Sequence, residues 1–101
     1  MADSVAEQIA ALKDEDWAIR EEAAMALGTF RDPRAVAPLV GLLRDADRAV
    51  RQAAIDALTA IGEPSVPVLG LCLSDSQPGV QEAASSVLAL IADSRVLTPL
   101  I

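Results

Sequence analysis

Nearly the same line of sequence occurs three times in this chain, and this repetition constrains the fold more than any other feature. Residues 16–27 read DWAIREEAAMAL, residues 47–58 read DRAVRQAAIDAL and residues 77–88 read QPGVQEAASSVL, so the repeats follow at steps of 31 and 30 residues. Self-similarity at a fixed period of this size is typical of solenoids, whose units stack because one unit cannot bury its own apolar face. The repetition favours a function carried by an extended surface rather than by a pocket.

Within each repeat the apolar residues are spaced as in an amphipathic helix, at steps of three and four. The same positions, which we call columns, are apolar in all three repeats. The members are Ile19, Ala23, Ala26, Leu27 and Phe30, then Val50, Ala54, Ala57, Leu58 and Ile61, then Val80, Ala84, Val87, Leu88 and Ile91. We therefore expect helices over residues 17–30, 48–61 and 79–92. Asp16 and Asp47 are suited to cap the first two, because a carboxylate accepts hydrogen bonds from free backbone N–H groups.

A second, more apolar segment lies between successive repeats and predicts the other helix of each unit. Residues 36–43 (VAPLVGLL) resemble residues 66–73 (VPVLGLCL) and, more faintly, residues 5–12 (VAEQIAAL). Prolines near the start of these segments fit a first helical turn, where the missing N–H costs nothing. We expect helices over residues 4–13, 34–44 and 65–74, and a partial helix over residues 95–101. The expected core positions on these helices are Ile9, Val40, Leu12, Leu43 and Leu73.

Together these elements predict one all-α domain over residues 1–101, a right-handed α-solenoid of about three stacked helical hairpins. A chain of 101 residues with 52% hydrophobic residues is sufficient for a core of its own. Residues 96–101 (VLTPLI) resemble residues 35–40 (AVAPLV) and lack the Leu-Leu half that follows there. We therefore expect an apolar C-terminal end that allows self-association.

The charge and cysteine content exclude several classes of partner and of site. The net charge of −7 argues against a nucleic acid or an anionic membrane surface, both of which require a basic patch. No apolar run approaches the ~18 residues of a membrane span, and the acidic N-terminus lacks the basic region of a signal peptide. Cys72 is the single cysteine, so no internal disulfide forms. This fits a reducing compartment, and we expect a cytoplasmic protein.

The repeats resemble HEAT-like repeats of the short type found in phycobilisome lyase subunits. The shared line is Val-Arg-x-x-Ala-Ala-x-x-Ala-Leu, followed by an Asp/Glu-Pro turn and Val-x-x-Leu. It occurs here as Ile19, Arg20, Ala23, Leu27, Asp32 and Pro33, and again as Val50, Arg51, Ala54, Leu58, Glu63 and Pro64. The resemblance covers almost the whole chain. It implies a helical solenoid, in a family that mostly serves as a binding scaffold and of which only some members belong to enzymes.

The resemblance also implies a structural role for the arginine column. In HEAT-like proteins this column and the aspartate of the preceding turn resemble a ladder of charge-assisted bonds between repeats. The residues concerned here are Asp16, Arg20, Asp47 and Arg51, and the third repeat has Gln81 in the arginine column. We expect Arg51 to stabilise the stack more than Arg20, which follows only half a unit.

No group of residues predicts catalysis. The chain has no histidine, which removes the usual general base and the commonest zinc ligand. The resemblance implies that the lack of histidine also removes the iron ligands that the deoxyhypusine hydroxylase branch of the family uses. The acidic turns at residues 14–16 and 45–47 are better explained as helix caps than as a metal site. Cys72 stands in an apolar column, which favours a core residue over a nucleophile. We expect no cofactor and no enzymatic activity.

Small or apolar residues on the outward side of the second helices indicate a protein-binding surface. Val68 and Leu71, with Pro38 and Gly41 alongside, occupy positions where solvation would favour Lys or Glu. In HEAT-like solenoids this surface is concave and faces the partner. Trp17 is either a binding hot spot or a cover for the N-terminal end of the stack.

These observations predict a non-catalytic protein–protein interaction scaffold with a protein partner of unknown identity. The alternative is a subunit or fragment of a phycobilin lyase-type (chromophore lyase) complex, which would need a partner chain because this one lacks reactive groups. A third class, DNA-lesion recognition by HEAT-like glycosylases, is opposed by the acidic charge.

Overall fold

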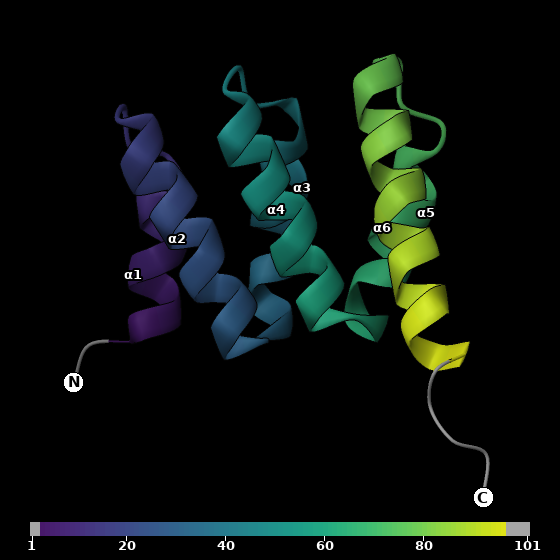
Figure 1. Ribbon diagram of the computed structural model, residues 1–101. Helices are drawn as coiled ribbons and strands as arrows, with labels where there is room; N and C mark the ends of the chain where they lie inside the picture. Colours follow the sequence, from purple (N-terminus) through teal and green to yellow (C-terminus); the bar gives the residue numbers. More distant parts are fainter. Residues whose placement is uncertain (1–2, 97–101) are drawn as a thin grey trace, which may run out of the picture.

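The computed structural model describes residues 3–96, and every regular element within them is helical. The α-helices are α1 (Ser4–Ala11), α2 (Trp17–Phe30), α3 (Val36–Gly41), α4 (Arg48–Ile61), α5 (Val66–Cys72) and α6 (Pro78–Val96). Three short 3-10 helices accompany them: η1 (Pro33–Ala35), η2 (Leu42–Arg44) and η3 (Glu63–Ser65). The helices stand side by side as three pairs, α1 with α2, α3 with α4 and α5 with α6 (Figure 1). The right-handed twist expected for the solenoid stays a prediction.

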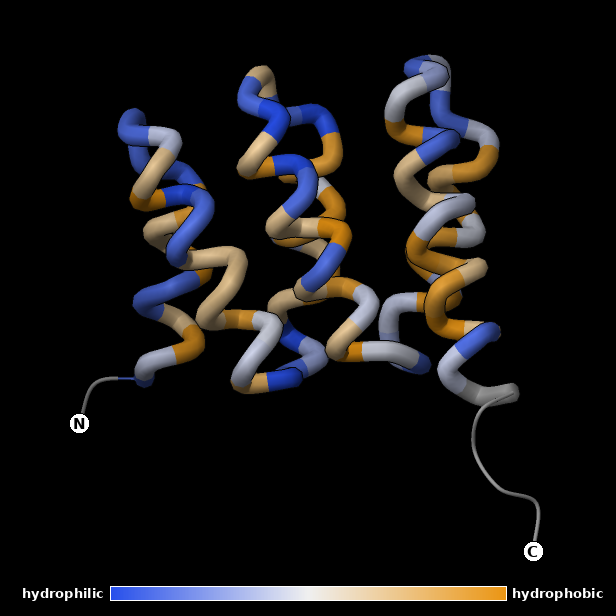
Figure 2. Tube along the Cα trace, viewed as in Figure 1, coloured by the Kyte–Doolittle hydropathy of each residue, from blue (hydrophilic) through white to orange (hydrophobic). Residues whose placement is uncertain are grey.

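The long helices α2, α4 and α6 form one layer, and the shorter α1, α3 and α5 form a second layer behind it (Figure 1). We call these the front layer and the back layer. Figure 2 shows hydrophilic residues concentrated in the loops at both ends of the pairs, with apolar residues along the helices between them. The core therefore lies between the layers and between neighbouring pairs.

Helices α2 and α4 begin and end at the residues expected, because local chemistry defines both ends. The side chains of Asp16 and Asp47 accept hydrogen bonds from backbone N–H groups of the first turn, as expected of N-caps. At the other end Arg31 and Gly62, which share a column, have positive φ values of 55° and 77°. A positive φ ends a helix and reverses the chain, so the second helix of the unit can pack back on the first.

The second helices are shorter than expected and are divided into 3-10 and α segments. The expected range 34–44 is occupied by η1, α3 and η2, whereas α1 ends at Ala11 and α5 at Cys72. Pro33 and Pro64 lie in the opening 3-10 turns, where their missing N–H groups are tolerated.

Helix α6 contradicts the expected start of a new helix at residue 95, because it continues to Val96. The reason lies in two columns. Ala92 stands where Arg31 and Gly62 end their helices, and Ser94 stands where Pro33 and Pro64 open the next segment. Alanine favours helix continuation. The remainder of the expected partial helix, residues 97–101, lies outside the described residues.

Most of the predicted core columns are buried, with three exceptions among the large side chains. Ile19, Phe30 and Leu73 are exposed, although their counterparts in neighbouring units are buried. All three lie at an end of the stack, where none of the described helices covers them. The prediction that they belong to the core is therefore wrong for this chain. Close packing inside the stack is clearest at Gly28, where an added Cβ would lie 3.0 Å from the Cα of Ala57.

No single helix within residues 3–96 is both long and apolar enough to cross a membrane. The segments Arg48–Ile61 and Glu63–Cys72 reach that length and composition only as a pair, with a bend of 116° between them.

Candidate interaction surface

The outward side of α3 and α5 forms a surface without charge. Neither helix contains a charged residue, and the two helices contact each other in the back layer. Of the predicted binding residues on this surface, Leu71 and Gly41 are exposed and Val68 and Pro38 are half-buried. We call this surface the α3–α5 strip; its members are Ala37, Pro38, Gly41, Pro67, Val68, Gly70 and Leu71.

Three members of the strip, Ala37, Pro67 and Gly70, were not predicted as binding residues. A simpler signal would have found them, since residues 35–43 and 64–73 contain no Asp, Glu, Lys or Arg in a chain that is 23% charged. Burial accounts for part of this lack of charge, but several members of the two stretches are exposed and still uncharged.

Trp17 is not part of this strip. It is the first residue of α2, in the front layer, and about half of its surface is exposed. At about 100° of rotation per residue, Trp17 lies roughly 200° around α2 from Ile19, which lies at the N-terminal end of the stack. The structure therefore separates Trp17 from the other four predicted binding residues.

A ladder between units exists, but its acceptor differs from the one expected. The Nε and Nη2 atoms of Arg20 donate to the carboxylate of Asp45 at 2.9 and 3.2 Å. Its Nη1 atom donates to the backbone carbonyls of Asp14 and Glu15 at 2.8 and 3.0 Å. Arg20 thus joins the turn before α2 to the turn before α4. Asp16 and Asp47 do not accept these bonds, because their carboxylates already cap the helices.

The bonds of the two arginines favour the opposite order of stabilisation from the one expected. Arg51 donates to the backbone carbonyls of Asp45 and Ala46 at 2.7 and 3.1 Å and forms no ion pair with a described carboxylate. In the third unit the side-chain amide of Gln81 donates to the carbonyl of Asp75. Gln81 therefore makes the same kind of bond to a backbone carbonyl as the arginines of its column, but it carries no positive charge. The carboxylate of Asp75 forms its ion pair with Arg44 instead.

The acceptor column Asp14, Asp45 and Asp75 was not recognised from the sequence. Each carboxylate accepts the N–H two residues later, at 2.8 to 2.9 Å, and thereby folds its own turn. The signal was available, since aspartate recurs at this position in all three turns while the next two positions vary.

Asp45 is the most enclosed acidic group of the ladder. The side chains of Arg20 and Asp45 are 18% and 9% exposed. Burial by itself raises the pKa of Asp45, but the hydrogen bonds from Arg20 and from the N–H of Asp47, with the positive charges of Arg20 and Arg51, lower the pKa below its ordinary value. The carboxylate is thus held in its ionised form.

A second, exposed ion-pair group lies at the opposite end of the helices. Arg34 pairs with Asp3 at 2.6 Å and with Asp32 at 3.0 Å. Hydrogen bonds from Arg34 lower the pKa of both carboxyl groups. Because Asp3 caps α1, this group connects α1 to the turn that precedes α3.

The cysteine and the carboxylates were considered above as possible chemical groups. Cys72 is buried, as predicted, and burial raises the pKa of its thiol, which disfavours the reactive thiolate. Within residues 3–96 no three side chains of Cys, Asp or Glu come together so that they could hold a metal ion.

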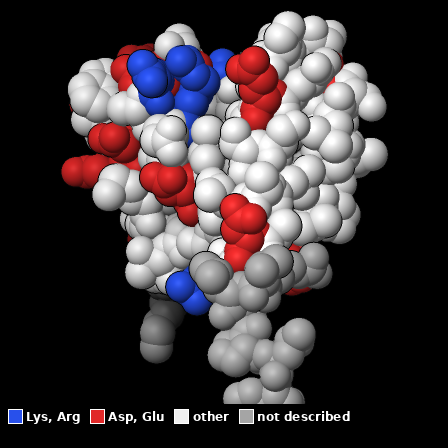
Figure 3. Space-filling view, turned by 45° about the vertical axis from the view of Figure 1, so that its right-hand side comes forward, with Lys and Arg blue, Asp and Glu red and all other residues white. Residues whose placement is uncertain are grey.

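The charged residues are unevenly distributed over the surface. In the view that brings the C-terminal unit forward, Asp and Glu side chains run down the middle, and the right half is almost free of charge (Figure 3).

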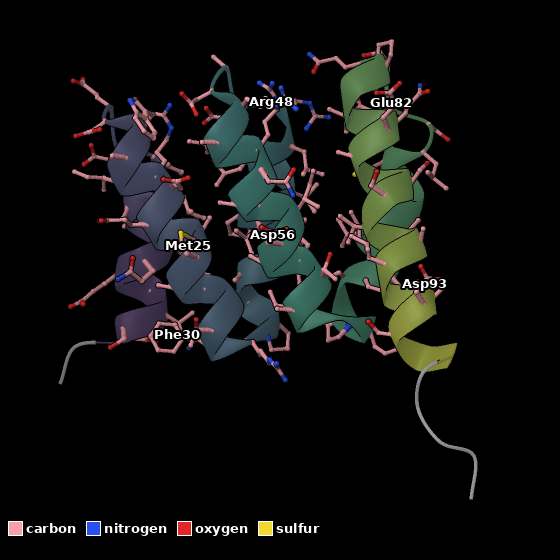
Figure 4. All side chains as sticks on the ribbon, viewed as in Figure 1. Met25, Phe30, Arg48, Asp56, Glu82 and Asp93 are labelled. Atoms are coloured by element: carbon pink, nitrogen blue, oxygen red, sulfur yellow. The ribbon has the colours of Figure 1, made fainter. Side chains whose placement is uncertain are left out.

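An open groove that the sequence did not predict lies between α2 and α4, with a volume of about 680 Å³. It arises because the residues between the two helices are small. Met25 and Asp56 project from the front layer at this groove (Figure 4). Its lining comprises Met25, Gly28, Thr29, Arg31, Ala53, Asp56, Ala57 and Ala60.

Comparison with known proteins agrees with this architecture. The family model of the PBS lyase HEAT-like repeat matches residues 19–45, and the model of HEAT repeats matches residues 42–101. No curated protein matches the chain.

Two solved structures are similar. Human deoxyhypusine hydroxylase, in complex with glycerol, has a TM-score of 0.68 and 28% identity over 96% of this chain and 35% of that one. An engineered protein from the Northeast Structural Genomics Consortium has a TM-score of 0.57 and 26% identity over 90% of this chain and 46% of that one. The chain thus spans less than half the length of either structure. Because the HEAT-repeat model covers more than half of its residues, this chain belongs to the HEAT-repeat family.

Proposed function

We propose that this chain is a non-catalytic, cytoplasmic scaffold module that binds an apolar segment of another protein along the α3–α5 strip. The observation that carries the proposal is Leu71, whose surface is 78% exposed on a helix without any charged residue. The exposed leucine side chain forms no favourable interaction with water. Burial under a partner would remove most of its apolar area from water and so favour binding. Gly41 and Ala37, on the neighbouring helix α3, are small and exposed and allow a partner backbone to approach closely.

The absence of catalysis is part of the proposal. Human deoxyhypusine hydroxylase is an enzyme, but this chain corresponds to about a third of its length. The chain also has no histidine, and its one thiol is buried. We propose that the similarity reflects the shared helical repeat and not a shared reaction.

A second candidate is supported by the match of residues 19–45 to the PBS lyase HEAT-like repeat. In this alternative the chain is part of a phycobilin lyase-type complex and contributes binding surface, while another chain supplies the chemistry. Specific association with a purified phycobiliprotein subunit would favour this candidate over a general scaffold.

The first test compares two exposed apolar residues in different layers. Leu71→Glu should abolish capture of partner proteins by the immobilised chain. Met25→Glu, which changes another exposed apolar residue, in the front layer, should leave capture intact. Because the strip is uncharged, capture by the unaltered chain should depend only weakly on salt. Circular dichroism and melting temperature should be nearly the same for all three proteins.

Two results would contradict the proposal. Undiminished capture by Leu71→Glu would remove the strip from consideration, and a large drop in its melting temperature would identify Leu71 as a structural residue.

A further inference from the structure

The groove between α2 and α4 is lined mainly by small or apolar side chains. Gly28, Ala53 and Ala57 form its buried floor, and Ala60 lies exposed at its margin. The floor is made of small residues because α2 and α4 touch there, at Gly28 and Ala57. The side chain of Met25 also lines the groove and is 60% exposed. With a volume of about 680 Å³, the groove has room for apolar side chains of another molecule.

Trp17 lies on the same side of α2 as this groove. Gly28 follows Trp17 by about three helical turns of roughly 3.6 residues each, so both residues project toward α4. Trp17 is 49% exposed. Tryptophan and methionine are among the residue types enriched in protein interfaces. Trp17 and Met25 thus give this part of α2 two exposed side chains suited to contact with a partner.

Carboxylates without an ion pair lie beside these apolar residues. Asp56 lines the groove and is exposed, and Figure 4 shows Asp56 and Met25 projecting from the front layer. The carboxylate of Asp56 accepts a hydrogen bond from the side-chain amide of Gln52 at 3.1 Å but forms no ion pair with a described residue. Glu21 stands about one turn after Trp17 and one turn before Met25, and it likewise has no ion pair among the described residues. The groove therefore has a negative margin.

Two arginines near the ends of α2 and α4 lie away from the middle of the groove. Arg31 is the only cation among the described residues that line the groove, and it directly follows the last residue of α2. Arg48 begins α4 in the column of Trp17, so it projects toward α6 as Trp17 projects toward α4. The middle of the groove therefore keeps the negative charge of Glu21 and Asp56.

These features define the chemistry of an occupant. A chain with a net charge of −7 repels acidic segments, whereas basic side chains would meet unpaired carboxylates at the groove. The groove lies between two helices of 14 residues, each roughly 21 Å long. A ridge of apolar side chains on another helix fits a groove of this kind, and flanking Lys or Arg side chains would reach its margin.

We propose that the groove between α2 and α4 binds a basic amphipathic helix of another protein. The apolar ridge of that helix lies on the floor of the groove, against Met25. Its Lys or Arg side chains pair with Asp56 and Glu21, and Trp17 packs against one end of the helix.

This site is separate from the α3–α5 strip, because the groove belongs to the front layer and the strip to the back layer (Figure 1). The two sites also differ in their dependence on salt. Salt screens pairing with exposed carboxylates, whereas contact with the uncharged strip changes little. Capture of partner proteins at high salt therefore reports on the strip alone, and failure of either proposal leaves the other intact.

The test uses two synthetic peptides of 14 residues, the length of α2, that place leucine on one face of a helix. The first peptide carries lysine on its other face, and the second carries glutamate at the same positions. Fluorescence anisotropy measures the binding of each peptide to the unaltered chain. The lysine peptide should bind, and its affinity should fall as salt is added. The glutamate peptide should bind at least about tenfold more weakly.

Asp56→Lys and Glu82→Lys form a matched pair of variants. Each reverses one exposed carboxylate of the front layer, so the two variants have the same net charge. Figure 4 shows Glu82 on α6, away from α2. Asp56→Lys should weaken binding of the lysine peptide at least about tenfold, and Glu82→Lys should weaken it about twofold or less. Met25→Gln removes an apolar contact without a change of charge and should also weaken binding, whereas Leu71→Glu should not.

Three results would overturn the proposal. The first is the absence of binding by the lysine peptide. The second is an equal loss of affinity in Asp56→Lys and Glu82→Lys, which would show attraction to the net charge and not to the groove. The third is loss of binding in Leu71→Glu, which would place the peptide on the α3–α5 strip. Circular dichroism checks that each variant is folded, as expected for changes at exposed positions.

Discussion

At the scale of single residues, the acidic turns use one type of side chain for two tasks. Asp16 and Asp47 cap the helices that follow them. Asp45, two residues before a cap, closes its own turn and also receives the guanidinium of Arg20 from the preceding unit. The difference matters because capping is local, whereas the bond between Arg20 and Asp45 connects two units.

We predict that Arg20→Ala lowers the free energy of unfolding by about 1–3 kcal/mol, because the change removes a two-point bond to a largely buried carboxylate. Arg51→Ala should cost about 1 kcal/mol or less, because this side chain bonds only to backbone carbonyls. Urea denaturation of both variants measures the difference. Equal losses would show that the bond to the Asp45 carboxylate adds nothing.

The dependence on pH provides a control for the same bond. The pKa of Asp45 is lowered in the folded protein, so its contribution to stability is present above about pH 4, the ordinary pKa of an aspartate. It is lost as the pH falls through the lower folded value. The stability difference between the unaltered chain and Arg20→Ala should therefore shrink on acidification. A difference that stays constant would mean that Asp45 is not the group involved.

At the scale of helices, close approach depends on a few small residues. Gly28 contacts Ala57, and no space remains for a side chain between α2 and α4 at that point. Gly70, in α5, faces open space. The same substitution should therefore have opposite effects at these two glycines.

We predict that Gly28→Ala destabilises the protein by about 1–2 kcal/mol, since a Cβ placed 3.0 Å from the Cα of Ala57 forces the helices apart and outweighs the gain in helix propensity. Gly70→Ala should stabilise it by about 0.5–1 kcal/mol, because alanine restricts the unfolded chain and meets no neighbour. Thermal and urea melts of the two variants test this. Similar effects at both positions would contradict the assigned contact.

At the scale of the whole molecule, stability is distributed along the stack. Each unit contacts only its neighbours, so a unit at an end has support from one side only. Helix α4 is packed against α2 on one side and α6 on the other. The C-terminal unit also has Gln81 where the earlier units have Arg20 and Arg51, although Gln81 retains one bond to the turn before α6.

We predict that hydrogen exchange is slowest in α4 and fastest in the second half of α6, through partial opening from the C-terminal end. Uniform protection across the helices, or fastest exchange in α2, would show that the units open together or from the other end.

The sequence by itself determined those features that depend on a few neighbouring residues. The bounds of α2 and α4 followed from the apolar period and from Asp16 and Asp47, because capping and helical periodicity act within one or two turns. The burial of Cys72 followed from its apolar column. The uncharged strip was visible as two stretches without Asp, Glu, Lys or Arg.

Only the tertiary structure decided features that depend on which unit lies against which. Arg20 bonds to Asp45, 25 residues away, and not to the nearer cap at Asp16, because stacking places the next turn within reach of the guanidinium. Ile19 and Phe30 have the same periodicity as Val50 and Ile61, yet they are exposed and the others are buried. A repeated sequence specifies equivalent side chains, but burial requires a covering helix, and at an end of the stack that helix must come from outside the unit.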